Sequence, residues 1–192
     1  DKSKEYHRQS AAISQQKGEL LSVGITRRMT VALLKQGQVQ EALLLLNDLV
    51  EKKLLCSIED KMYIAQSLGS CYNALKQYGL AEKYYLESIA WSQQAPLRFQ
   101  VLAYQRIAQF YITNARYSRA EPYLKLLLSV PRQQILPNYL IEVYLMRFKV
   151  DSARHNYPEA IRHYQQYKAL EDSIYNETKS RQMLAGTPRL FR

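Results

Sequence analysis

A small residue recurs at a nearly fixed interval along this chain, flanked each time by apolar residues at helical spacing. Ala42, Ala81, Ala120 and Ala160 are separated by 39, 39 and 40 residues. Three residues before each alanine stands a valine or tyrosine, and four residues after it stands a leucine or tyrosine. This period is typical of stacked helical hairpins. The small residue lets two antiparallel helices approach closely, and the larger residues fill the space between neighbouring hairpins.

The pattern predicts an all-α fold, a right-handed α-α superhelix of about four hairpins. A leading helix is expected over 4–18, and a long C-terminal helix over roughly 158–184. The four units are expected at residues 23–56, 62–95, 101–134 and 141–175. We therefore expect a single domain over 1–185, followed by a frayed tail at 186–192.

Turn residues separate the two helices of each unit. Gly37 allows a tight turn between helices expected at 23–36 and 39–53. Pro122 and Pro158 are expected in the first turn of their helices, where a proline removes no helical hydrogen bond.

The second unit carries part of a known repeat signature. Leu68, Gly69 and Tyr72 lie at the spacing of the tetratricopeptide signature W-x2-L-G-x2-Y, with Ala65 in place of the tryptophan. The chain resembles tetratricopeptide repeat (TPR) proteins over about 165 residues. The resemblance implies a TPR-like solenoid without catalytic activity that binds proteins or peptides.

The C-terminal end is similar to the last repeat of the TPR sensor regions of Bacteroidetes-type signalling proteins. A motif close to YK-x-L-x-DSI-x-N-E, followed by a lysine, closes those arrays. The matching residues here are Lys168, Leu170, Asp172, Ser173, Ile174, Asn176, Glu177 and Lys179.

In that family the helix leads to a coiled coil or membrane span, and then to a histidine kinase or helix-turn-helix output domain. The resemblance therefore implies the sensor or scaffold part of a bacterial two-component or transcriptional regulator. It favours the periplasm over the cytoplasm, with any membrane contact made through a segment outside this chain. The final MLAGTPRLFR departs from the family because it breaks the helix.

Basic side chains outnumber acidic ones by 27 to 17, mostly in the second half of the chain. Residues 1–95 carry 12 basic and 10 acidic side chains, whereas residues 96–192 carry 15 and 7. Within 98–132, Glu121 is the only acid. The basic residues there are Arg98, Arg106, Arg116, Arg119, Lys125 and Arg132. This region could attract an acidic peptide, nucleic acid or an anionic membrane, or be an ordinary solvated face, so a nucleic-acid binder stays an alternative.

The sequence offers little chemistry for catalysis. No two of His7, His155 and His163 have the spacing of a zinc site, and no Gly-rich phosphate loop follows a strand. Glu159 and His163 lie four residues apart and are expected to form a solvated pair. Cys71 falls on an apolar helical stripe, where a thiol acts as a small hydrophobic group. We therefore predict no enzymatic activity, no cofactor and no metal.

The remaining candidate site is the concave face, which the first helix of each hairpin lines in a TPR stack. The repeat register gives ten candidate partner-binding residues: Arg27, Lys35, Tyr63, Gln66, Ser70, Asn73, Gln105, Gln109, Thr113 and Lys149. Amides, hydroxyls and one aromatic ring suit hydrogen bonding to an extended peptide or a helix, and Arg27 and Lys149 favour an acidic one. The same residues would also suit a merely solvated helix face. A stand-alone assembly factor or lipoprotein that holds a client is a further alternative.

Overall fold

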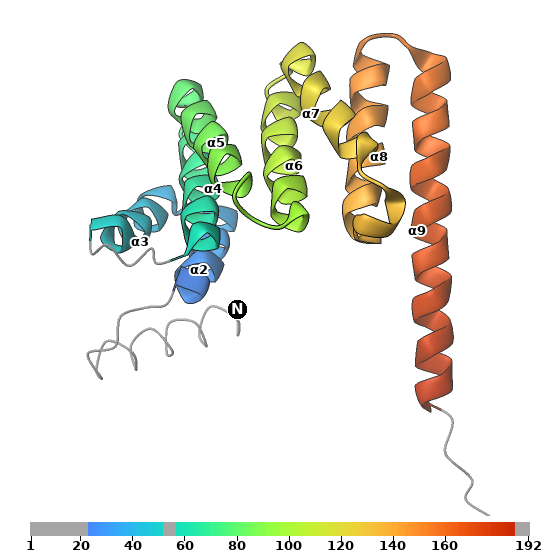
Figure 1. Ribbon diagram of the computed structural model, residues 1–192, viewed down its shortest axis with the longest axis horizontal. Helices are drawn as coiled ribbons and strands as arrows, with labels where there is room; N and C mark the ends of the chain where they lie inside the picture. The colour runs from blue at the N-terminus through green and yellow to red at the C-terminus, as the bar shows by residue number, and fades with distance from the viewer. Residues whose placement is uncertain (1–22, 52–56, 187–192) are drawn as a thin grey trace, which may run out of the picture. The chain divides into compact units, whose positions relative to one another are not determined.

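The computed structural model describes residues 23–51 and 57–186, with side chains as far as Lys179, and within these ranges the regular structure is entirely helical (Figure 1). The helices are α2 (Val23–Lys35), α3 (Val39–Glu51), α4 (Ile58–Ala74), α5 (Tyr78–Ser92), α6 (Leu97–Thr113), α7 (Tyr117–Ser129), the short 3-10 helix η1 (Arg132–Gln134), α8 (Pro137–Ala153) and α9 (Tyr157–Gly186). The expected leading helix and the tail after 186 lie outside the described residues.

Consecutive helices form the four predicted hairpins, α2 with α3, α4 with α5, α6 with α7, and α8 with α9. The long C-terminal helix is also confirmed, since α9 has 30 residues. One expectation was wrong. Because α7 begins at Tyr117, Pro122 lies inside the helix, beyond its first turn.

All four hairpins turn with the same backbone geometry. The turn residue has a positive φ each time, 74° at Gly37, 60° at Lys76, 55° at Ala115 and 60° at His155. The next amide donates to the carbonyl five residues back: Gln38 to Leu33 at 2.9 Å, Gln77 to Tyr72 at 2.9 Å, Arg116 to Tyr111 at 2.8 Å, and Asn156 to Asp151 at 2.9 Å. This hydrogen bond satisfies a carbonyl at the end of each first helix. A glycine occupies this position only at Gly37, so the other three turns keep a side chain in the left-handed region.

The repeated alanines are buried, as the sequence predicts. Ala42, Ala81 and Ala120 are 0% exposed and Ala160 is 3% exposed. Each lies in the first turns of a second helix, the position where a small side chain permits close packing of two helices.

The chain divides into two compact units, residues 1–110 and residues 111–192. The core of the first unit joins α2, α3 and α4 through Leu33, Ala42, Leu43, Leu46, Leu49, Ile64, Leu68 and Cys71. A Cβ placed on Gly69 would lie 3.1 Å from ring atoms of Tyr85, so the glycine allows this ring to pack against α4. In the second unit α8 pairs with α9, and α9 continues past the end of α8 (Figure 1).

We expect Ala81→Leu to lower the free energy of unfolding by about 1–3 kcal/mol, because three added heavy atoms must fit a fully packed position. Ala90→Leu is the matched control, since Ala90 is an exposed residue of the same helix and its replacement should change stability by less than about 0.5 kcal/mol. Urea unfolding followed by circular dichroism measures both. Equal effects would mean that Ala81 is not at a close helix contact.

Candidate binding surfaces

Three successive first helices of the first unit are joined by a row of rings and guanidinium groups. The Arg27 guanidinium of α2 lies 4.1 Å from the ring centroid of Tyr63 on α4. The Tyr63 ring meets Phe99 of α6 edge to face, with centroids 6.1 Å apart and an interplanar angle of 78°. The Arg98 guanidinium lies 4.7 Å from the Phe99 centroid. We name Arg27, Tyr63, Gln66, Arg98 and Phe99 the first-helix face.

Three members of this face, Arg27, Tyr63 and Gln66, are among the ten sequence candidates, and the structure brings Arg27 and Tyr63 into contact. Sequence reasoning missed Phe99 and Arg98. Both lie before residue 101, where the sequence predicts the third hairpin to begin. The signal that could have found them is positional, since Phe99 follows Tyr63 by 36 residues.

The remaining polar candidates differ widely in burial. Gln66 and Gln105 are only 7% and 3% exposed, so they lie much deeper than the register implied. The Ser70 hydroxyl is already used, lying 2.9 Å from the Gln66 carbonyl and 3.0 Å from the Tyr85 hydroxyl. Asn73 is half-buried. The exposed candidates are Lys35, Gln109, Thr113 and Lys149. Thr113 and Lys149 belong to the second compact unit. The expectation of one continuous stripe stays a prediction.

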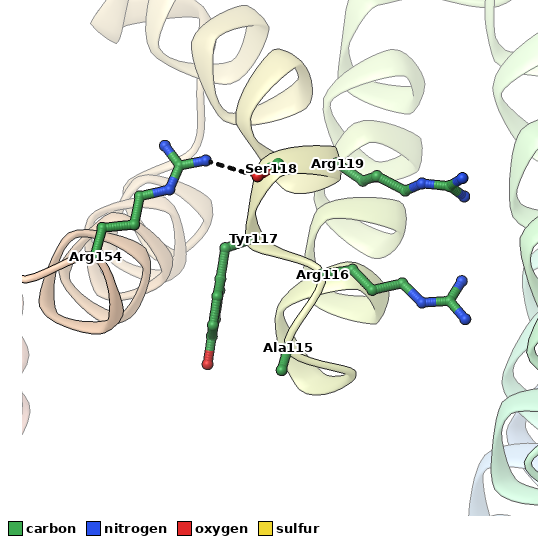
Figure 2. A pocket seen from close by; sticks show the side chains of 6 residues that line it. All are labelled: Ala115, Arg116, Tyr117, Ser118, Arg119 and Arg154. Carbon is green, nitrogen blue, oxygen red and sulfur yellow. Dashed lines mark hydrogen bonds between the residues drawn. The ribbon is translucent and has the colours of Figure 1, made fainter.

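A hollow of about 480 Å³ lies at the turn between α6 and α7, lined by Ala115, Arg116, Tyr117, Ser118, Arg119 and Arg154. Figure 2 shows that Arg116 and Arg119 extend side by side, away from Arg154. Arg154 instead donates to the Ser118 hydroxyl at 3.4 Å and to Glu121 at 3.2 Å. The three guanidinium groups do not converge, so the hollow is not built to hold one anion.

A chain of charged side chains links α7, α8 and α9. Arg147 of α8 lies 2.8 Å from Glu121 of α7 and 3.7 Å from Asp151. Arg154 reaches the other oxygen of Glu121 at 3.2 Å. Asp151 in turn lies 2.8 Å from Nδ1 of His163 on α9. Both side chains of this last pair are buried, with 5% and 3% of their surface exposed.

The hydrogen bonds of His163 fix its tautomer. Arg162 can only donate, so Nε2 of His163, 3.1 Å from Nη2 of Arg162, accepts. Nδ1 therefore carries the proton and donates to Asp151. Glu159 pairs with Arg162, and this ion pair lowers the pKa of Glu159. The expected solvated pair of Glu159 and His163 is wrong, because His163 is buried and turns toward α8.

The buried thiol of Cys71 has no role in chemistry. Burial raises its pKa to about 11, so it stays protonated near neutral pH and does not act as a nucleophile. It packs among apolar side chains of α2, α3 and α4, as the sequence predicts.

Two further observations concern only residues 23–51 and 57–186. None of the helices there is both long enough and apolar enough to span a bilayer. No three His, Cys, Asp or Glu side chains there come together in a group suited to a metal ion.

A family model described as tetratricopeptide repeat matches residues 64–94 and 101–134, which cover most of the hairpins α4–α5 and α6–α7. Two hairpins of this chain are tetratricopeptide repeats. A search of curated proteins finds no match. Among solved structures, the crystal structure of BtubC (BKLC) from P. vanneervenii is similar over 100% of this chain and 77% of that chain, with a TM-score of 0.67 and 18% identity.

The TPR matches and this likeness of fold show the predicted class, an all-α, TPR-like superhelix. TPR arrays are in general binding scaffolds without catalytic activity, and they usually take protein partners. The repeats therefore favour a protein-interaction scaffold. The domain boundaries and the ten candidate residues stay predictions.

Proposed function

We propose that this TPR domain binds an acidic protein segment along the first-helix face of its first unit. The observation that carries the proposal is the contact row of Arg27, Tyr63, Phe99 and Arg98. It joins three consecutive hairpins through side chains that suit recognition, aromatic rings and arginines.

A guanidinium stacked on a ring keeps its charge, and its N–H groups remain available at the edge of its plane. Such a group binds a carboxylate through two parallel hydrogen bonds. Within the described residues, neither Arg27 nor Arg98 has an acidic partner. The two guanidinium groups therefore offer donors, which an acidic segment would satisfy.

The double variant Arg27→Ala, Arg98→Ala should weaken binding of an acidic peptide by about 10- to 100-fold, because it removes two charge-assisted contacts. The probes are peptides selected on the wild-type chain from a random displayed library. Their sequences should be enriched in Asp and Glu. Fluorescence anisotropy with a labelled selected peptide gives both dissociation constants.

The matched control is Arg28→Ala, Arg106→Ala, which removes the same charge from exposed positions on the same two helices. It should leave the dissociation constant within about twofold. Equal weakening by both double variants would show a general charge effect. Selected peptides without acidic residues would contradict the proposed specificity.

We also propose that the domain is the sensor or scaffold part of a bacterial signalling or transcriptional regulator, acting through α9. The support is the resemblance of the segment from Lys168 to Lys179 to the closing repeat of such proteins. The test is the complete gene, which should encode a membrane span or coiled coil and an output domain after this region. A complete gene without either would contradict this context and leave the binding proposal intact.

A further inference from the structure

One repeat position is covered in three hairpins and open in the fourth. It lies four residues after each repeated alanine, and its exposures are 0% for Leu46, 6% for Tyr85, 0% for Leu124 and 45% for Tyr164. Tyr85 is covered from α6, where Phe110 lies 5.2 Å from it between ring centroids. Tyr164 also has ring neighbours, Phe148 of α8 at 5.3 Å and Tyr167 at 5.8 Å between centroids, yet 45% of it remains exposed.

The exposed side of α9 around Tyr164 is a continuous stripe. Its members follow one another in steps of four and three residues: Tyr157, Ile161, Tyr164, Lys168, Glu171 and Tyr175. Alternating steps of four and three residues are the spacing at which two helices pack along a seam. Four of the six are large apolar or aromatic residues, with exposures of 57% for Tyr157, 58% for Ile161, 45% for Tyr164 and 65% for Tyr175. We call these six residues the α9 stripe.

The stripe differs from the two preceding second helices at one position near its start. Ile161 stands one residue after its alanine, where the two preceding hairpins have Glu82 and Glu121. Glu121 forms ion pairs with Arg147 and Arg154. The corresponding isoleucine has no such use, and an isoleucine 58% exposed beside two tyrosines favours burial against another surface.

We propose that the α9 stripe binds the same stripe of a second copy of this chain, with the two helices antiparallel. The register follows from the two charges at its centre. When Lys168 faces the partner's Glu171, Tyr164 faces the partner's Tyr175, and each contact occurs twice by symmetry. The segment from Tyr164 to Tyr175 is then complementary to itself in charge, and Tyr157 and Ile161 lie beyond it.

The same charges disfavour a parallel, in-register pairing of this stripe. A parallel pair would place Lys168 against the partner's Lys168 and Glu171 against the partner's Glu171, which is repulsive. In one chain Lys168 already lies 2.8 Å from Glu171 and 3.3 Å from Asp172, and all three are exposed by 42% or more. Lys168 donates hydrogen bonds to these two acids, which raises the pKa of Lys168. Accepting one of these bonds lowers the pKa of Glu171, so both groups stay charged near neutral pH. In the proposed dimer, Lys168 and Glu171 would each gain an opposite charge from the second copy, and neither would be left without a partner.

Charge reversal tests both whether the α9 stripe is the interface and whether a second copy of the chain binds it. We expect the wild-type chain to dimerise in sedimentation equilibrium, and K168E or E171K alone to weaken dimerisation at least tenfold. Mixing the two variants should restore a dimer, because one chain then offers two acids and the other two lysines. The charge-matched controls are Lys125→Glu on α7 and Glu177→Lys, which lies off the stripe on α9, and both should dimerise like wild type.

The orientation is tested by disulfide formation with Cys56 replaced by serine, since the buried Cys71 is unreactive. Tyr164→Cys mixed with Tyr175→Cys should give a crosslinked heterodimer, and neither variant should crosslink alone.

Crosslinking of Tyr164→Cys alone would show a parallel pair and overturn the proposal. A wild-type chain that stays monomeric at its highest soluble concentration would overturn it too, and would assign the stripe to another occupant. Dimers unaffected by both charge reversals would place the interface elsewhere. Circular dichroism of each variant shows that it is folded.

Discussion

Asp151→Ala should lower the free energy of unfolding by about 2–4 kcal/mol. The change leaves the Nδ1–H of the buried His163 without its acceptor. It also removes the carboxylate that pairs with Arg147, four residues earlier on α8. The variant no longer has to bury this carboxylate, and the desolvation cost that is saved offsets part of the lost stability. The net loss is therefore smaller than for an isolated ion pair. Urea unfolding at neutral pH measures it.

The control is Asp172→Ala, which removes a carboxylate of the second unit that is 60% exposed and lies 3.3 Å from Lys168. Its effect should stay below about 1 kcal/mol because exposed ion pairs contribute little. A second variant adds His163→Leu to Asp151→Ala. It should recover part of the lost stability, because the stranded N–H is then gone. Equal effects of the two aspartate variants would mean that the buried pair does not hold α8 to α9.

Leu124→Ala should lower the free energy of unfolding by about 2–5 kcal/mol, the range for removing a fully buried leucine. Leu124 is 0% exposed, and it holds the same repeat position as Leu46 and Tyr85. The loss combines the transfer of the side chain with the cavity that it leaves behind. Differential scanning calorimetry and urea unfolding should both report it.

Leu126→Ala is the matched control, since Leu126 lies on the same helix and is 45% exposed. We expect a change of less than about 1 kcal/mol there. If Leu124→Ala and Leu126→Ala were equally tolerated, the repeat position would not be a packing position in this hairpin.

The helices and the buried alanines could be predicted because the same pattern recurs four times at one spacing. Repetition fixes which side of each helix is covered, and burial of the alanines follows from it. The turn at Gly37 could be predicted because a glycine marks it. The turns at Lys76, Ala115 and His155 could not, because no glycine marks them and only the backbone shows the shared left-handed conformation.

The candidate site was predicted less completely, because a helical register shows which residues share a helix face but not how deeply each side chain is buried. It placed Arg27 and Tyr63 together, yet it could not show that Gln66 and Gln105 are buried. The buried pair on α8 and α9 was missed for a different reason. Asp151 and its partner His163 lie on successive helices, twelve residues apart and outside any local motif.

The four identical turns bear on how the chain folds. Each is closed by a hydrogen bond between residues only five apart, so a hairpin can form its turn without help from its neighbours. Chains with such local contacts fold quickly, and repeat arrays can begin to order at any unit and extend from there. We expect the first hairpin to lead, because Gly37 enters the left-handed conformation without the steric cost that Lys76, Ala115 and His155 must meet.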